Sequence, residues 1–196
     1  MLPLAFRLAG APVLVIGAGK VGAYKAGQLL EAGAVVSVIS EEILVAPPEG
    51  VERVERRRFT TGDLEGYWLV IAATGDPTVN DDIVAEARAR RIWLNVVDDP
   101  ERSSFYFMAL HRQGEVTLAV TTEGAAPALA QAIRTLAAER LPNNLGEVAA
   151  ALRAEREALH ESGASTENLD WRPRIEELLG TEPGAVASRG EFLGTE

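Results

Sequence analysis

The chain has 196 residues, of which 47% are hydrophobic and 24% are charged, and its formal net charge is −10. This composition can fill an ordinary hydrophobic core, which excludes global disorder, and the acidic balance argues against a nucleic-acid partner. The absence of cysteine excludes a disulfide scaffold, a thiolate metal site and a cysteine nucleophile, and with two histidines we expect no permanent metal site.

A glycine-rich turn follows the first apolar run of the chain. Gly17, Gly19 and Gly22 form the pattern Gly-x-Gly-x-x-Gly, placed between a predicted strand and a predicted helix. A second strand completes a βαβ unit of about 30 residues, in which the N-terminus of the helix binds the pyrophosphate of a dinucleotide. We predict such a site here; the alternative is a turn whose glycines only pack helix against strand. The elements are a strand at 13–16, a helix at 21–32 and a strand at 35–39.

Strands and helices continue to alternate after this unit. Two of the segments are continuous apolar runs, typical of strands buried on both faces of a parallel sheet, and three arginines mark the exposed end of another strand. The pattern predicts an α/β fold with a Rossmann-type, doubly wound parallel sheet, whose ligands bind beyond the carboxyl ends of the strands. The segments are strands at 51–59 (with Arg56, Arg57 and Arg58), 67–72 and 92–97, and a helix at 78–91.

The pattern changes after Pro100. We expect an antiparallel hairpin with strands at 104–110 and 115–121 and a turn at 112–114, then helices at 128–140, 145–161 and 171–179. The predicted parts are a dinucleotide-binding domain (1–110), a small α+β region of hairpin plus helix (111–144), a helical domain (145–180) and a frayed tail (181–196). No apolar run approaches the ~20 residues of a membrane span, and we expect a soluble, cytoplasmic protein with no membrane partner.

Acidic residues mark a possible contact to the cofactor. Glu41 and Glu42 follow the second strand, about 20 residues past the glycines, where a carboxylate commonly binds the ribose hydroxyls. Carboxylates at this position repel a 2′-phosphate, so NAD is favoured over NADP as the cofactor. The alternative is an ordinary exposed turn.

A second acidic pair, Asp98 and Asp99, follows the last predicted parallel strand. At the mouth of a cofactor crevice these carboxylates can act as a general acid or base, and Pro100 fixes the turn behind them. They are equally typical of a helix cap or a turn. Lys20 and Lys25 are the only lysines, and their position near the glycine turn reflects either phosphate contact or chance.

Taken together, these motifs resemble a known family. Their combination comprises the glycine turn, Lys25, residues 69–74 (Leu-Val-Ile-Ala-Ala-Thr), Asn80, residues 95–100 (Asn-Val-Val-Asp-Asp-Pro), Ser104 and Phe105. This combination is far more specific than the glycine pattern alone. With it, the chain closely resembles the precorrin-2 dehydrogenase/sirohydrochlorin ferrochelatase family, which includes the N-terminal half of siroheme synthase, over residues 2–179.

The resemblance implies an NAD-linked oxidation of precorrin-2, a tetrapyrrole, to sirohydrochlorin, with insertion of Fe²⁺ or Co²⁺ as a possible second activity. It also implies a homodimer formed through region 111–144, with Asp98 as the catalytic residue. The implied cofactor contacts are Gly17, Gly19, Lys20, Val21, Gly22, Glu41 and Glu42, to which we add Thr74, Asn95 and Val97. The substrate has several carboxylates, and the candidates for binding it are Arg102, Ser104, His111, Arg112 and Arg134.

One loop departs from the family pattern. Ala126 stands where the family often has serine, and Glu123 stands where it has glycine, so we expect altered substrate contacts or control there. Two other interpretations of the chain remain open. One is a dimeric regulatory module that senses NAD without turnover, and the other is an oxidoreductase acting on a different small substrate.

Overall fold

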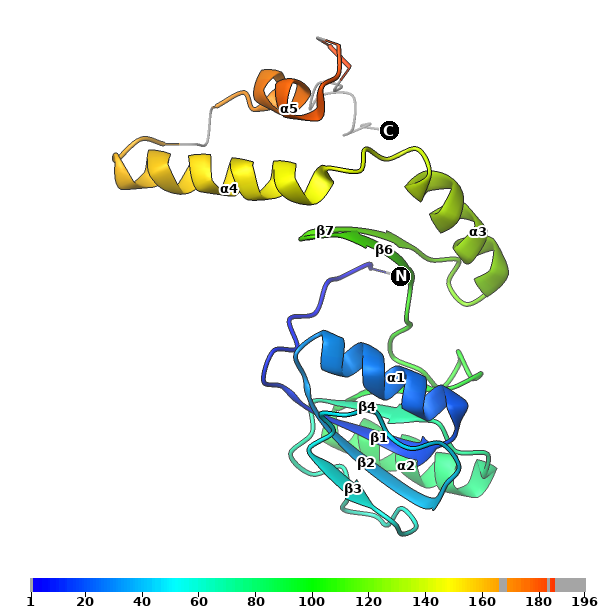
Figure 1. Ribbon diagram of the computed structural model, residues 1–196. Coiled ribbons are helices and arrows are strands. Elements are labelled where there is room, and N and C mark those ends of the chain that lie inside the picture. The colour runs from blue at the N-terminus through cyan, green and yellow to red at the C-terminus, as the bar shows by residue number, and fades with distance from the viewer. Residues whose placement is uncertain (1, 166–168, 183, 186–196) are drawn as a thin grey trace. The chain divides into compact units, whose positions relative to one another are not determined.

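The computed structural model describes residues 2–165, 169–182 and 184–185, and the chain divides into two compact units after Phe107 (Figure 1). The predicted boundary at residue 110 and the finer division of the second unit stay predictions. Most of the predicted tail (181–196) lies outside the described residues. Within the described part of the chain, no helix combines the length and apolar character needed to cross a bilayer.

The first unit is built on a parallel sheet, as the sequence predicts. Its five strands lie in the order β3-β2-β1-β4-β5, so the chain reverses its direction of travel across the sheet between β1 and β4. Such a reversal opens a crevice at the carboxyl ends of the strands. The strands are β1 (Pro12–Ala18), β2 (Val35–Ile43), β3 (Arg53–Glu55), β4 (Leu69–Ala72) and β5 (Trp93–Val96).

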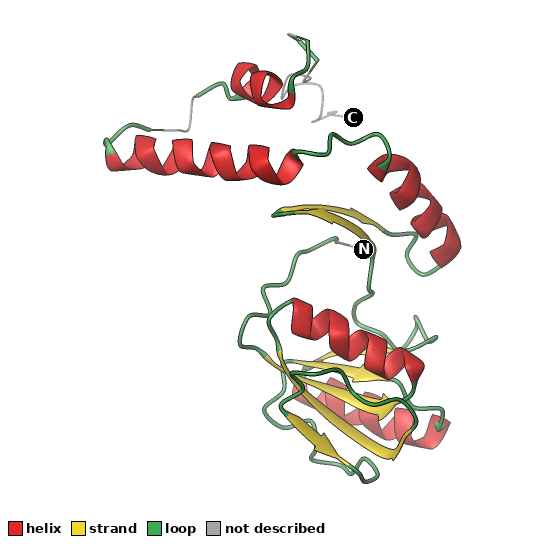
Figure 2. Ribbon diagram, in the orientation of Figure 1, coloured by secondary structure: helices red, strands yellow, loops and turns green. Residues whose placement is uncertain are grey.

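Two helices, α1 (Lys20–Glu31) and α2 (Pro77–Arg90), cover opposite faces of this sheet (Figure 2). Alternate residues of β1 explain the arrangement, because neighbouring side chains of a strand point to opposite faces. Val13 and Val15 share a core with α1, whereas Leu14 and Ile16 share one with α2. The strand is therefore buried on both sides, and the sheet forms a rigid base for the loops at its edge.

Two predicted strands differ from the observed ones. The strand expected at 51–59 is the three-residue β3, because Arg57 leaves the ladder to bind Glu55 (Nε–Oε2 2.7 Å) and Asp63 (Nη1–Oδ2 2.6 Å). The strand expected at 104–110 begins only at Ala109. Before it, Ser104 binds the edge of β5 through backbone and side chain, with its amide 2.7 Å from Leu94 O.

The second unit contains the predicted hairpin and helices. Its strands pair antiparallel, and the turn lies at Gly114 and Glu115 rather than at 112–114, with Gly114 at φ 56°. Glu123 has φ 56°, in the left-handed region that favours the glycine expected at this position. The elements are β6 (Ala109–Gln113), β7 (Val116–Val120), α3 (Pro127–Ala138), α4 (Leu145–Glu161) and α5 (Arg172–Leu179).

Candidate functional site

The three glycines after β1 have different structural roles. Gly17 has φ 106°, and a Cβ there would lie 2.3 Å from Ala73 O. A Cβ on Gly22 would lie 2.0 Å from Gly17 O, so this glycine lets α1 pack directly on the turn. Gly19 has no atom within 4 Å of its Cβ position and therefore faces open space. Packing requires the first and third glycines, and the second leaves room for a ligand to approach the backbone.

The N-terminus of α1 is prepared for an anion. Its N-cap residue, Gly19, supplies no side-chain hydrogen bond, and the first turn contains no acidic residue. Ala23 N donates to Gly19 O at 3.0 Å, and the amides that precede Ala23 have no carbonyl partner within the helix. These free amides and the positive end of the helix dipole fit the pyrophosphate of a dinucleotide.

A cavity of about 240 Å³ opens beside this turn. It is smaller than the roughly 300–1,000 Å³ of a complete small-molecule pocket, so it accommodates part of an extended dinucleotide. The predicted residues Glu41, Glu42 and Thr74 line it, and the position of the glutamates at the end of β2 marks the adenosine half. The structure thus brings the glycine turn, the acidic pair and the Thr74 loop together in one cavity.

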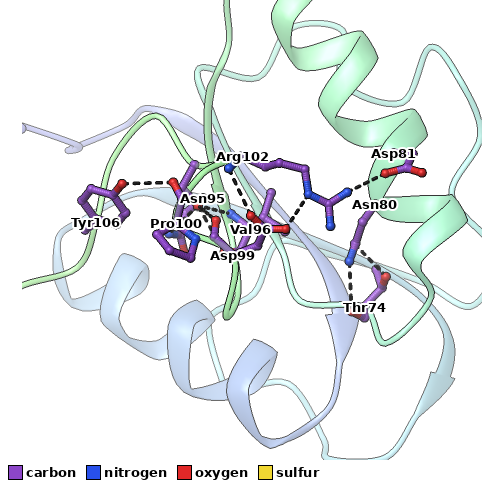
Figure 3. A network of polar contacts seen from close by, with 10 residues as sticks. Thr74, Asn80, Asp81, Asn95, Val96, Asp99, Pro100, Arg102 and Tyr106 are labelled. Carbon is purple, nitrogen blue, oxygen red and sulfur yellow. Dashed lines mark hydrogen bonds and ion pairs between the residues drawn. The ribbon is translucent and has the colours of Figure 1, made fainter. Parts of the chain in front are cut away.

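The Thr74 loop is fixed by its own side chains. Thr74 Oγ1 donates to Asn80 Oδ1 at 2.8 Å, and Asn80 Nδ2 donates back to Thr74 O at 3.4 Å (Figure 3). Asp76 caps α2, since its Oδ1 accepts from Thr78 N at 2.9 Å and Val79 N at 3.4 Å. These hydrogen bonds fix the conformation of the loop between β4 and α2, which lines the cavity.

Two arginines also line the cavity, a role that the sequence analysis did not assign to them. The run 56–58 was interpreted as a solvated surface, yet Arg57 and Arg58 face the space beside Glu41. The carboxyl ends of parallel strands share one edge of the sheet, and Arg57 and Arg58 follow the third strand. That rule would have placed both arginines at the edge where the cavity lies.

The two acidic residues after β5 have different surroundings. Asp98 has φ 59°, its side chain is exposed, and no hydrogen bond or ion pair engages its carboxylate within the described part of the chain. Asp99 instead accepts from Arg102 Nε at 2.5 Å, and this guanidinium holds the pKa of Asp99 below its usual range. The geometry therefore leaves Asp98 available for chemistry and gives Asp99 a role in the turn.

The turn that carries Asp98 is held at several points (Figure 3). Ser103 Oγ accepts from Val96 N at 2.9 Å and donates to Asp99 O at 2.8 Å. Tyr106 donates through its hydroxyl to Pro100 O at 3.0 Å. Because a non-glycine residue in the left-handed region needs such support, the surrounding bonds explain how Asp98 keeps its unusual backbone.

Several predicted contact residues have structural partners in the first unit. Asn95 is buried in β5 and donates to Phe105 O at 3.1 Å, and Val97 packs against the core on the α1 side. Arg102 binds both Asp99 and Asp81, and Ser104 Oγ accepts from Leu94 N at 2.8 Å. Their predicted roles toward cofactor or substrate stay predictions, as do those of Lys20 and Val21 in the first turn of α1.

The remaining predicted substrate contacts belong to the second unit. His111 and Arg112 lie in β6, with His111 Nε2 3.2 Å from Gln113 Nε2, and Arg134 of α3 donates to Gln131 Oε1 at 2.9 Å. Their predicted role also stays a prediction. Among the described residues, no group of three or more histidine or acidic side chains forms a possible metal site.

Comparison with known proteins identifies the family. Residues 4–109 match a family described as "Putative NAD(P)-binding", which is more than half of the chain. The chain belongs to this NAD(P)-binding family. The free amides and open space at Gly19 fit the dinucleotide that this description names.

The chain is also similar to siroheme synthases, which confirms the predicted resemblance. It is 39% identical to the siroheme synthase of Methylococcus capsulatus over 152 residues, covering 76% of this chain and 32% of the relative. It is 37% identical to the siroheme synthase of Tolumonas auensis over 194 residues, which cover 97% of this chain and 37% of that relative. The chain thus spans about a third of the length of these relatives.

A solved structure confirms the fold. SirC, a precorrin-2 dehydrogenase, superposes with a TM-score of 0.67 over 92% of this chain and 88% of its own, at 22% sequence identity. The doubly wound parallel sheet followed by smaller α+β and helical segments is therefore shared with that protein.

Proposed function

We propose that this protein oxidises precorrin-2 to sirohydrochlorin with NAD⁺ as the hydride acceptor. The observation that carries the proposal is the carboxylate of Asp98, which no described residue engages and which lies in a hydrogen-bonded turn after β5, at the same carboxyl-end edge of the sheet as the glycine turn. The names of the relatives and of the structural neighbour support the choice of substrate.

The oxidation removes a hydride and a proton from the substrate. NAD⁺ held by the glycine turn and by Glu41 and Glu42 would supply the hydride acceptor for this step. Asp98 accepts the proton, because its exposed carboxylate has no partner among the described residues and follows β5, the strand that pairs with β4 before the Thr74 loop. Ser103 and Tyr106 keep the turn in place and thereby aim the carboxylate. The products are sirohydrochlorin, NADH and one proton.

Acidic charge at the end of β2 favours NAD over NADP in this proposal. Glu41 and Glu42 both line the cavity and are exposed to it. Their carboxylates can accept hydrogen bonds from ribose hydroxyls, and they repel a phosphate at the same position.

We further propose that the protein is a homodimer and that helix α3 contributes to its interface. Leu129, Ile133 and Leu136 lie along one side of α3, and these residues are 54%, 42% and 53% exposed. Apolar side chains at this spacing form a stripe that a second copy of the chain would cover.

The experiment that tests the function replaces Asp98 by asparagine. Asparagine tolerates the left-handed backbone but cannot accept the proton, so turnover of precorrin-2 should fall by roughly 10²–10⁴-fold. The affinity for NAD⁺, measured by titration, should stay unchanged. Asp82→Asn, which removes an exposed carboxylate from α2, is the charge-matched control and should keep full turnover.

Wild-type turnover in Asp98→Asn would overturn the assignment of the proton acceptor. Fe²⁺ or Co²⁺ added to the wild-type reaction tests the metal-insertion step that the resemblance implies. Uptake faster than in a protein-free control supports that step, because Asp98 can also accept pyrrole protons. Uptake at the control rate restricts the proposal to the dehydrogenase.

A further inference from the structure

We propose that Arg58 and Glu41 together determine which dinucleotide the cavity accepts. Glu41 keeps the Arg58 guanidinium occupied, and in this state the cavity selects the 2′-hydroxyl of NAD. When Glu41 loses its charge, Arg58 becomes a binding group for the 2′-phosphate of NADP. The inference concerns the binding of the dinucleotide alone and does not depend on the identity of the substrate.

The geometry places Arg58 between two carboxylates at the cavity. Its Nε lies 3.3 Å from Glu41 Oε2, at the end of β2, and its Nη2 lies 2.9 Å from Asp76 Oδ2, at the start of α2. All three residues line the cavity. The segment after β3 is thus tied to both loops that flank the adenosine half of the site.

The Arg58 ion pairs can exchange with a ligand. The side chains of Arg58 and Glu41 are 61% and 65% exposed, and exposed pairs contribute little stability. Asp76 also caps α2, because its Oδ1 accepts a hydrogen bond from the first turn of that helix. A ligand phosphate that offers Arg58 a better partner therefore displaces these carboxylates at little cost to the fold.

The neighbouring arginine cannot serve in its place. Both terminal nitrogens of Arg57 bind Asp63, at 2.6 and 2.8 Å, and its Nε binds Glu55 at 2.7 Å. These hydrogen bonds raise the pKa of Arg57 above its usual range. Of the two arginines at the cavity, Arg58 is the one that can turn toward a ligand.

Charge explains why the native chain favours NAD. Glu41, Glu42 and Asp76 line the cavity together with Arg58, while the charge of Arg57 is already balanced by Asp63 and Glu55, so the local balance is negative. A planar guanidinium binds phosphate through two parallel hydrogen bonds, and in nucleotide-binding sheets an arginine near this position accommodates the 2′-phosphate. Glu41 opposes that contact twice, by repelling the phosphate and by holding the arginine.

The test measures the affinities of the full chain for NAD⁺ and NADP⁺ by titration calorimetry. We expect Glu41→Gln to strengthen NADP⁺ binding about tenfold or more, the scale of a hydrogen bond between charged groups. In the double variant Glu41→Gln/Arg58→Gln most of this gain should disappear, leaving only the part that comes from the loss of repulsion by Glu41. The control is Glu41→Gln/Arg56→Gln, which removes the same positive charge from an exposed neighbour of Arg58. This control should keep the gain in NADP⁺ affinity.

Two results would overturn the proposal. If the gain persists in full in Glu41→Gln/Arg58→Gln, it comes from the loss of repulsion alone and Arg58 is not a determinant. If Glu41→Gln leaves NADP⁺ binding unchanged, the pair does not control selection. Binding of NAD⁺ by each variant confirms that the site is folded, so these results remain separate from any failure in precorrin-2 turnover.

Discussion

At the scale of single residues, Gly19 and Gly22 differ in what a side chain would meet. A methyl group on Gly22 would collide with Gly17 O, whereas one on Gly19, at φ −85°, would point into open space. We expect Gly22→Ala to lower the free energy of unfolding by about 1–3 kcal/mol, as overpacking does. Gly19→Ala should keep wild-type stability and weaken NAD⁺ binding, because the methyl occupies the approach to the helix amides.

Urea unfolding and NAD⁺ titration of both variants check this expectation. Equal losses of stability would contradict the assignment of Gly19 to the ligand and Gly22 to packing. Wild-type affinity in Gly19→Ala would contradict it equally.

The residues of the site were predictable to different degrees. Glu41 and Glu42 could be placed by their spacing from the glycines, and they line the cavity. The acidic pair after β5 could not be resolved from spacing alone, and only the family resemblance pointed to Asp98 rather than Asp99. The physical difference lies in a backbone angle and in the contact of Asp99 with Arg102. Arg58 was missed because a cluster of like charges is ordinarily solvated, and only the tertiary fold brings Glu41 and Asp76 within reach.

At the scale of elements, continuous apolar runs were the most reliable signal. The strands predicted at 67–72 and 92–97 are confirmed as the shorter strands β4 (Leu69–Ala72) and β5 (Trp93–Val96), and all of their residues except Trp93 are buried. The segment 104–110 was predicted as a strand because its apolar residues resemble one. Ser104 and the preceding Ser103 instead take the place of a strand partner at the edge of β5, which hydrophobic periodicity cannot reveal.

Helix α1 contains a lysine whose charge opposes folding. Lys25 Nζ lies 3.5 Å from the centre of the Phe107 ring, and burial lowers the pKa of Lys25 from 10.5 to about 8. Below pH 8 the lysine is charged in both folded and unfolded states, and the folded state bears the cost of burying that charge. Between about pH 8 and 10.5 only the unfolded state keeps the proton, so stability rises with pH.

We therefore expect Lys25→Met to be more stable than the wild type at neutral pH, with the difference shrinking as the pH rises from about 8 toward 10.5. Urea unfolding of both proteins across this range measures the difference, and other titrating groups cancel in the comparison. A constant difference at all pH values would contradict the altered pKa.

At the scale of the whole molecule, the two units differ in how far their apolar faces are buried. The first unit buries both faces of its sheet, whereas α3 in the second unit exposes the stripe of Leu129, Ile133 and Leu136. The proposed homodimer predicts a solution mass of twice 21.0 kDa by light scattering. Ile133→Glu should dissociate the dimer, because it places a charge within the apolar contact.

Thr135→Glu adds the same charge on a different side of α3 and serves as the control. It should leave the mass unchanged. A wild-type monomer, or a dimer that Ile133→Glu does not disturb, would exclude this stripe from the interface.

We propose that the chain couples oxidation of precorrin-2 to reduction of NAD⁺. The most direct measurement mixes the wild-type protein with both compounds in the absence of oxygen and follows the absorbance of NADH and of the macrocycle together. The account predicts that NADH and sirohydrochlorin appear in equal amounts. A protein that binds NAD⁺ and forms no NADH would contradict it and would favour a sensor of the dinucleotide without turnover.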